Sequence, residues 1–586
     1  MQRVGTIQTS VPLGRGPDRW LYGRWLDLLV GCGLGYLVLV PVLLGYEFFS
    51  GVHVWPVAAV VAFGMLINAP HYGATVLRVY GDRGDRAKYR FFALHATLAL
   101  ALVFAGASRS VWLASGLITI YLTWSPWHFA GQNYGLALMF LRRRGIEVDA
   151  RTKRLFYLSF VLSAALAMLA LHGGRGQFSV TVPTLEAPTV PRLISLGIPA
   201  AATTWLFAVV GTAYVGCLAA AGWRLRHAGS WSDQAPAWTL VCTQALWYTV
   251  PVLSMTGDEL LPFAAGWVST AHSLQYLWVT AYYAKRSPTH ERTGPFLVKA
   301  LMAGTAVTIL PSLLFAPDLF GRLPWDAGLA MTTFSIVNIH HFILDGAIWK
   351  LRDGGIARVL LRSSVDSEGR SCDISRRSAV AALAWTVAAL SLVVPAMIAF
   401  EAIGMYLDAG PDRTSAAAWR TRWIGRETVA LHLDAGAKSE QAGRDREAIA
   451  HYRRSIELFP IPEAWDALAG IYVRHQQPAL AYEAYDRAIA LRPESPRLLF
   501  RRARVRLALA ESGERPDPYL GETTATLQRV LEIKPDYAAA SLLLARITAR
   551  SGQRGEAVQI LERGIAAAGN EPSPRLRARL AALRAD

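Results

Sequence analysis

Cysteine is scarce in this sequence, and the few cysteines are scattered. The chain has four in 586 residues, at positions 32, 217, 242 and 372. Three of them lie in apolar runs, and none lies in the C-terminal part of the chain. Neither a framework of disulfides nor a zinc site built from cysteines is therefore indicated.

Charged side chains are also few. They make up 18% of the residues, against 53% hydrophobic ones, and the mean hydropathy is +0.27 with 19 Trp. This composition is typical of a polytopic protein that lies in a lipid bilayer. The net charge of +17 does not indicate nucleic acid as a partner, because many basic residues fall in short loops between apolar runs.

Long apolar runs are missing after residue 401, and this absence divides the chain. We predict an all-α protein: a cytoplasmic segment at 1–26, a polytopic transmembrane bundle at 27–401, a linker at 402–424, a helical repeat domain at 425–570, and a capping helix or tail at 571–586. The bundle should have eleven spans, at 27–49, 52–77, 91–107, 110–141, 155–172, 198–222, 236–257, 261–284, 296–316, 328–349 and 378–401.

The loops between these spans differ sharply in basic residues. The N-terminal segment and every second loop hold 27 Lys and Arg, whereas the alternate loops hold 4. The positive-inside rule then predicts a cytoplasmic N-terminus in the inner membrane of a bacterium. An odd number of spans places the repeat domain on the extracytoplasmic side.

The C-terminal part carries a helical repeat. Ala481, Tyr485 and Pro493 reproduce the spacing of Ala448, Tyr452 and Pro460, which lie one copy earlier. This spacing of small and aromatic residues is typical of a tetratricopeptide (TPR) solenoid, whose paired helices usually bind a protein partner. The consensus positions in the second copy are Trp465, Leu468, Ala469, Tyr472, Ala481, Tyr485, Ala488 and Pro493.

Several catalytic motifs are absent. The sequence has no phosphate-binding glycine loop, so no nucleotide cofactor is indicated, and it has no serine nucleophile elbow. The repeated histidine boxes of membrane desaturases are missing as well. Only one pair of adjacent histidines occurs, at His340 and His341.

Single histidines occur instead on several predicted spans, at a similar depth near the inner face. We expect them to bind a metal, because imidazole without thiolate suits iron, zinc, copper or nickel. The candidate ligands are His71, His128, His272 and His341, with His340 as a substitute for His341. Polar neighbours one turn away would orient them, namely Asn68, Gln132, Gln275, Asn338 and Asp345. The alternative is that each histidine only hydrogen bonds a neighbouring helix. We place His432, His451 and His475 on the surface of the repeats.

Three of these segments also carry a resemblance. The stretches Ala69-Pro70-His71-Tyr72-Gly73, Trp127-His128-Phe129-Ala130-Gly131-Gln132 and His340-His341-Phe342-Ile343-Leu344-Asp345-Gly346 are similar to the Brp/Blh family of β-carotene 15,15′-dioxygenases. The resemblance spans about residues 60–350. It implies a membrane-embedded helical fold that binds histidine-ligated iron, Fe(II), and cleaves a carotenoid.

Two classes of function remain open from the sequence. The first is a metal-dependent membrane enzyme that oxidises a lipophilic small molecule, with a pocket lined by Tyr72, Trp124, Trp127, Tyr276 and Phe342. The second is a non-enzymatic membrane anchor or assembly factor whose repeats bind envelope proteins. A transporter with histidine proton relays is a third, less favoured interpretation, since no inverted repeat is evident.

Overall fold

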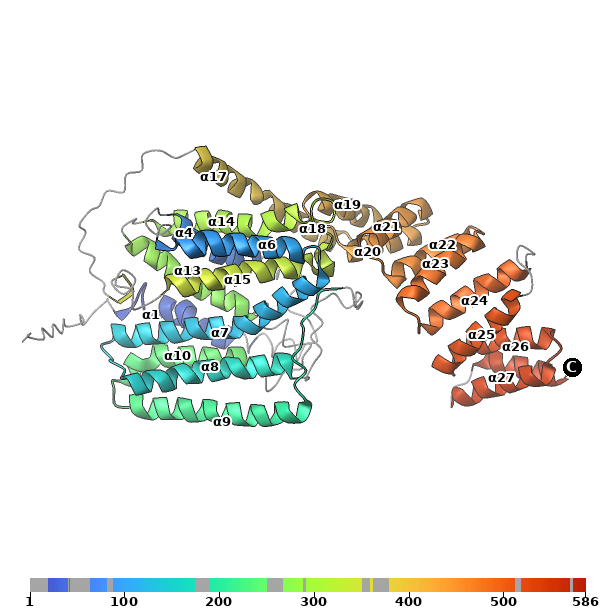
Figure 1. Ribbon diagram of the computed structural model, residues 1–586, viewed down its shortest axis with the longest axis horizontal. Coiled ribbons are helices and arrows are strands. Elements are labelled where there is room, and N and C mark those ends of the chain that lie inside the picture. The colour runs from blue at the N-terminus through green and yellow to red at the C-terminus, as the bar shows by residue number, and fades with distance from the viewer. Residues whose placement is uncertain are drawn as a thin grey trace, which may run out of the picture. The chain divides into compact units, whose positions relative to one another are not determined.

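A computed structural model describes residues 19–39, 42, 64–81, 88–173, 190–249, 267–287, 291–349, 359–361, 379–511, 518–569 and 573–585. Across these residues all regular structure is helical, as predicted (Figure 1). The chain forms two compact units. The membrane unit comprises residues 1–323 and 328–406, and the repeat unit comprises residues 324–327 and 407–586.

The membrane unit is a bundle of helices, three of which (α4, α6 and α15) begin directly after a short π-helical segment. Helices α7, α8, α9 and α10 lie side by side, and α4, α6, α13, α14 and α15 form the rest of the bundle (Figure 1). Its elements are α1 Arg24–Leu26, η2 Asp27–Gly31, η3 Gly64–Asn68, α4 Ala69–Tyr80, η4 Phe91–Ala96, α6 Thr97–Ala107, α7 Val111–Arg143, α8 Ala150–His172, α9 Ala200–Leu225, α10 Trp231–Tyr248, α13 Ser269–Arg286, α14 Thr293–Leu314, η6 Trp325–Leu329, α15 Ala330–Ile348, α17 Ala379–Ser391 and α18 Val393–Leu407.

The prediction of eleven spans is too high for what the structure supports. Among the described residues, five helical stretches are long and apolar enough to cross a membrane: Ala150–His172, Ala200–Leu225, Thr293–Leu314, Trp325–Ile348 and Ala381–Leu407. Helix α7 is long enough to cross a membrane but is not one of these five, because polar side chains lie along its length. Residues 91–107 form a shorter apolar helix. The predicted spans at 27–49, 52–77, 236–257 and 261–284 lie partly outside the described residues.

Helix α9 shows the surface expected of a lipid-facing span. Trp205 and Trp223 are 75% and 64% exposed near its two ends, and Val209 and Val215 are exposed between them. Since a helix rises about 1.5 Å per residue, the two indoles are about 27 Å apart along the axis. This separation suits the thickness of the hydrocarbon core, with a tryptophan near each interface.

Helices α4 and α14 pack with their backbones in contact. A Cβ atom on Gly73 would overlap the carbonyl oxygen of Ala300, and one on Gly304 would overlap that of Ala69. Small residues allow this close approach, which is a common way to join helices in a membrane. The contact holds the first turn of α4, which carries His71, against α14 and so helps to position that side chain.

The repeat unit consists of antiparallel helix pairs stacked in chain order. Residues 402–424, which we expected to be a linker, are largely helical, because α18 continues to Leu407 and α19 packs on the first repeat. The helices are α19 Pro411–Trp423, α20 Val429–Gln441, α21 Asp445–Leu458, α22 Pro462–Arg474, α23 Pro478–Leu491, α24 Pro496–Glu511, α25 Pro518–Ile533, α26 Ala538–Arg550, α27 Arg554–Ala567 and α28 Pro574–Ala585.

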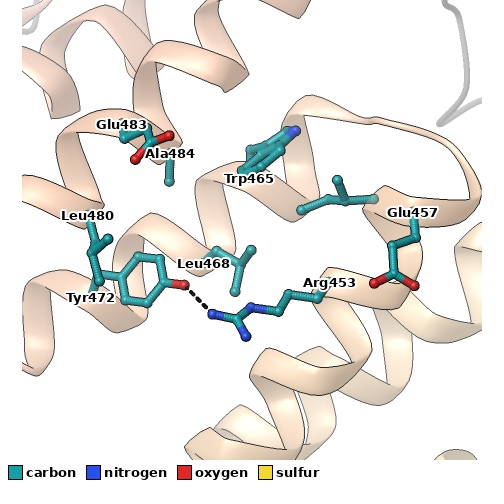
Figure 2. A pocket seen from close by; sticks show the side chains of 9 residues that line it. Arg453, Glu457, Trp465, Leu468, Tyr472, Leu480, Glu483 and Ala484 are labelled. Carbon is teal, nitrogen blue, oxygen red and sulfur yellow. Dashed lines mark hydrogen bonds between the residues drawn. The ribbon is translucent and has the colours of Figure 1, made fainter.

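The predicted consensus residues form the core between these helices. Ala481, Tyr485 and Ala488 are buried, and Trp465 packs against two neighbouring clusters of apolar residues. Trp465 also lines a pocket of about 310 Å³ between α21, α22 and α23 (Figure 2). At one side of this pocket the Arg453 guanidinium donates a hydrogen bond to the Tyr472 hydroxyl at 3.2 Å.

A short segment that precedes α15 also belongs to the repeat unit. The Asp326 carboxylate accepts hydrogen bonds from the backbone N–H groups of Val429 and Ala430, each at 3.0 Å. It therefore caps the N-terminus of α20 together with Thr428. The Arg426 guanidinium lies over the Trp325 ring, 3.6 Å from its centre. Residues 324–327 are thus held by the start of the repeats.

Candidate metal site

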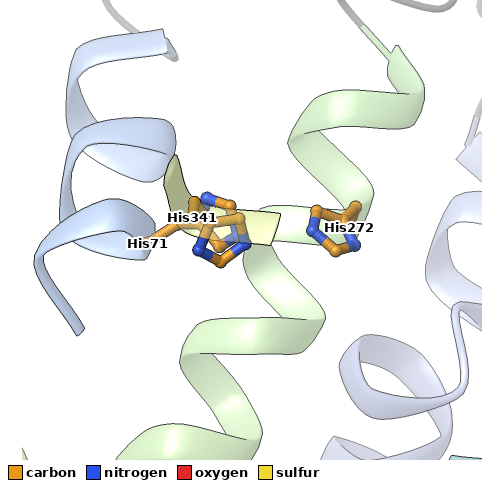
Figure 3. Close-up of side chains that lie close together, drawn as sticks. All are labelled: His71, His272 and His341. Carbon is orange, nitrogen blue, oxygen red and sulfur yellow. The ribbon is translucent and has the colours of Figure 1, made fainter. Parts of the chain in front are cut away.

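Four histidines from four helices of the membrane unit meet at one place. His71 is on α4, His128 on α7, His272 on α13 and His341 on α15. The ring centres of successive members are 5.0 Å apart for His71 and His272, 5.3 Å for His272 and His128, 5.2 Å for His128 and His341, and 4.1 Å for His341 and His71. Figure 3 shows three of these rings together. The four histidines therefore form a closed ring, although they lie far apart in the sequence.

The nitrogens of this ring lack ordinary partners. Within the described part of the chain, both ring nitrogens of His71 and of His272, and the Nε2 atoms of His128 and His341, are buried without a hydrogen bond. The side chains of His71, His272 and His341 are at most 2% exposed. A buried polar group without a partner costs about 1–3 kcal/mol, so six such nitrogens in one place favour a site that binds an ion.

The arrangement fits a transition metal ion. The ligand atoms of His71, His272 and His341 lie within 4.8 Å of one another, and so do those of His128, His341 and Asp345. With metal–nitrogen bonds of about 2.1 Å, adjacent imidazole centres lie on the order of 5 Å apart, as they do here. The donor set of imidazoles and one carboxylate, without sulfur, suits iron, zinc, copper or nickel. A single ion could satisfy most of the unpaired nitrogens.

Among the described residues, Asp345 is the acidic group at the histidine ring. Its Oδ1 atom accepts hydrogen bonds from the Tyr276 hydroxyl at 2.6 Å and from the Thr75 hydroxyl at 3.3 Å. Its Oδ2 atom lies 3.4 Å from Nε2 of His341 and 3.8 Å from Nε2 of His128. The carboxylate thus presents its second oxygen to the centre. It is placed to be a fifth ligand as well as the orienting group that we predicted.

The other predicted orienting residues do not contact the histidine nitrogens. Gln132 donates to Gln275 Oε1 at 3.1 Å and to the backbone oxygen of His272 at 3.3 Å. Asn338 donates to the backbone oxygen of Phe334 and hydrogen bonds the Tyr72 hydroxyl. Asn68 makes no bond to His71, whose two nitrogens have no partner among the described residues. The hydrogen bonds of Gln132 and Asn338 thus go to other groups.

The adjacent histidine takes another role. His340 points away from the ring, and its Nε2 atom lies 2.9 Å from the Thr97 hydroxyl on α6. This follows from helical geometry, because consecutive side chains diverge by about 100°. His341 is therefore the ring member, and His340 is not placed to replace it.

Aromatic rings enclose one side of the site. Phe342 stacks on His128 with ring centres 4.2 Å apart, and Phe129, which the sequence reasoning missed, stacks on His272 at 4.0 Å. Tyr72 contacts His71 at 4.9 Å, and Trp124 contacts Phe342 at 5.8 Å. Trp127 is 45% exposed and does not join this group. Four of the five predicted pocket residues, Tyr72, Trp124, Tyr276 and Phe342, thus lie at the site.

The repeat unit holds a second group of histidines, and the prediction that all three lie on its surface is wrong for two of them. His432 and His451 are fully buried rather than on the surface, whereas His475 is exposed and pairs with Asp445. The Nδ1 atoms of the two buried histidines lie 2.9 Å apart. On the far sides, His432 Nε2 is 2.9 Å from Glu427 Oε1, and His451 Nε2 is 2.9 Å from the Ser415 hydroxyl. Trp419 covers both rings.

The charges around this pair give the hydrogen bonds a direction. Burial alone raises the pKa of Glu427, but the hydrogen bonds from Arg454 and His432 outweigh burial and lower that pKa to about 2. Glu427 is therefore an ionised acceptor, and His432 Nε2 carries a proton. His451 then donates through Nδ1 to His432, and Ser415 donates to His451. Burial, followed by the repulsion that a second positive charge beside His432 would meet, lowers the pKa of His451 to about 4.

Comparison with known proteins assigns the C-terminal part of the chain. Two family models described as "Tetratricopeptide repeat" match, at residues 462–505 and 520–583. No curated protein matches the chain. The resemblance of the membrane unit to the Brp/Blh family therefore stays a prediction.

Three solved structures are similar to the chain at low identity. YrrB, a TPR protein with an unusual peptide-binding site, shares 19% identity over 32% of this chain and 91% of its own, with a TM-score of 0.26. TTC0263, a thermophilic TPR protein of Thermus thermophilus, has 24% sequence identity over 27% of this chain and 82% of its own length, with a TM-score of 0.23. Yeast Tom70 has 11% sequence identity over 89% of this chain and 96% of its own length, with a TM-score of 0.26. On the evidence of the family models, residues 462–505 and 520–583 are tetratricopeptide repeats.

Proposed function

We propose that this chain is a membrane-embedded enzyme that binds a transition metal and oxidises a lipophilic small molecule. His71, His128, His272 and His341 would hold the metal, with Asp345 as an additional oxygen donor. Iron is the favoured metal, since imidazole and carboxylate ligands with open positions are typical of non-haem iron oxygenases, and Fe(II) in such a site supplies the activation of dioxygen.

One observation carries the proposal. Four helices that are distant in sequence each contribute one histidine to the same place, and six of the ring nitrogens have no hydrogen-bond partner among the described residues. If the histidines only joined helices, each nitrogen should be satisfied by its own neighbour. His340 and His172 have that ordinary pattern in the same unit, because each contacts a threonine hydroxyl at 2.9 Å. Among the four ring members, His341 also contacts a threonine hydroxyl, through Nδ1, but its Nε2 atom and both nitrogens of His71 and His272 have no hydrogen-bond partner among the described residues.

The surroundings of the site favour a lipophilic substrate. Phe129, Trp247 and Phe342 belong to one buried cluster of apolar residues that borders two of the histidines. Such walls exclude water and offer apolar and π contacts rather than hydrogen bonds. Among the described residues, the groups placed to hold or move a proton at the site are the Asp345 carboxylate and the Tyr276 and Thr75 hydroxyls that adjoin it.

The repeat domain would recruit a protein partner on the extracytoplasmic side. Residues 324–327 lie in one of the loops that are poor in basic residues, and they fold into the repeat unit. The loop and the repeats therefore share one side of the bilayer, which the positive-inside rule assigns to the outside. The pocket beside Trp465 and Tyr472 is a candidate contact for that partner.

Oxygen uptake tests the proposed enzyme against the alternative of a non-enzymatic anchor. The purified protein would be loaded with Fe(II) in nanodiscs and supplied with a lipid extract of its own host membrane. We expect oxygen consumption that stops on addition of an iron chelator and is missing in His272→Ala. Metal binding without any oxygen uptake would contradict the oxygenase, and absence of metal binding would favour the anchor.

A further inference from the structure

We infer that Thr75 is a positioning residue of the histidine site: it holds the Nδ1–H group of His341 and thereby turns the lone pair of Nε2 toward the centre. This inference rests on the proposed metal site. Thr75 lies on α4, one turn after His71, and is 1% exposed. Sequence reasoning missed it, because a threonine in an apolar helix gives no signal of its own.

The Thr75 hydroxyl joins three groups from two other helices. Its Oγ1 atom is 2.9 Å from Nδ1 of His341, 2.6 Å from the Tyr276 hydroxyl and 3.3 Å from Oδ1 of Asp345. Tyr276 in turn donates to Asp345 and accepts a hydrogen bond from the Trp349 indole at 2.9 Å. These side chains are thus tied into one network around Thr75.

Counting protons gives the direction of the bond to His341. A threonine hydroxyl has one proton and can accept two hydrogen bonds. With Asp345 ionised, as a metal ligand is, the Tyr276 proton goes to Asp345 at 2.6 Å. The 2.6 Å contact between the Thr75 and Tyr276 oxygens then requires the Thr75 proton, since two lone pairs at that distance would repel. The 2.9 Å contact with His341 is left without a proton from Thr75. His341 Nδ1 must supply it.

The tautomer of His341 follows. A neutral imidazole carries one proton, and a proton on Nδ1 leaves Nε2 as a lone pair. That Nε2 atom is the one that is buried without a hydrogen bond among the described residues and lies beside Asp345 Oδ2. Metal-binding histidines are commonly held in this way, through the nitrogen that does not bind the metal. Thr75 supplies that support from the helix that carries His71.

Metal affinity tests this role. Co²⁺ would be titrated into the purified full-length protein in detergent, with dissociation constants and visible ligand-field spectra as readouts. Thr75→Val keeps the shape of the side chain but removes the acceptor, so we expect affinity to fall by about ten- to hundredfold and the spectrum to change. Thr75→Ser restores the hydroxyl and should restore both.

Thr280→Val is the matched control. Thr280 is similarly buried on α13, one turn from Tyr276, but its hydroxyl bonds backbone carbonyl oxygens, at 2.8 and 3.3 Å. Its loss should leave Co²⁺ affinity and spectrum unchanged. Equal affinity and spectrum in wild type and Thr75→Val would overturn the role of Thr75 alone and leave the metal site standing. A wild-type protein that binds no Co²⁺ would overturn the site and the role together.

Discussion

Replacing His341 with alanine should abolish metal binding, whereas replacing its neighbour His340 with alanine should leave it intact. His341 belongs to both groups of converging ligand atoms, so its removal breaks each of them. His340 lies one residue away on the same helix, but it contacts Thr97 and faces away from the ring. Both substitutions remove the same side chain from α15, which makes their difference specific to the site.

The measurement is the metal content per chain after purification and passage over a chelating resin. We expect a content near that of the wild type for His340→Ala and close to zero for His341→Ala. Equal retention in the two variants would contradict the assignment of His341. Equal loss would show that any disturbance of this part of α15 releases the metal, and the assignment would then have no support from the pair.

Acidification should open the first helix pair of the repeat unit. The pKa of His451 falls from 6.5 to about 4 on folding, so the unfolded chain binds more protons between these values. The corresponding stability is present above pH 6.5 and is lost as the pH falls toward 4. At about 1.4 kcal/mol per pKa unit, the loss is at most about 3 kcal/mol.

Hydrogen exchange of the full-length protein measures this opening. Amides of α20 and α21, corrected for the intrinsic rate, should lose protection as the pH falls from 6.5 to about 4, while those of α27 serve as an internal reference. His451→Gln should remove most of the pH dependence, and His475→Gln, which changes an exposed histidine, should not. Unchanged protection of α21 across this range in the wild type would refute this account of the pair.

Helix periodicity and composition predicted much of the fold. Trp465, Tyr485 and Ala488 occupy positions of a repeat whose local spacing is enough to define paired helices. The number of spans was harder to predict, because apolar length alone does not separate a span from a buried helix. In α7, polar residues such as Gln132 and Asn133 lie within one long helix and face other helices of the bundle.

The site was predictable as a set of residues but not as a network. A histidine within an apolar span stands out, and its expected depth follows from the orientation of the span, so His71, His128, His272 and His341 could be grouped in advance. The partners could not be predicted, since a side-chain amide one turn away is equally free to bond another helix. Thr75 and Phe129 reach the site through the packing of α4, α7 and α13, which no local pattern encodes.

X-ray absorption at the metal edge tests the central claim most directly. The wild-type protein, loaded with iron, should show a first shell of nitrogen and oxygen at about 2.0–2.2 Å and the outer-shell scattering of about four imidazoles. That scattering should fall by one imidazole in any single-histidine variant that still holds metal. A spectrum with no imidazole scattering, or a protein that takes up no metal at all, would contradict the convergence of His71, His128, His272 and His341 on one ion.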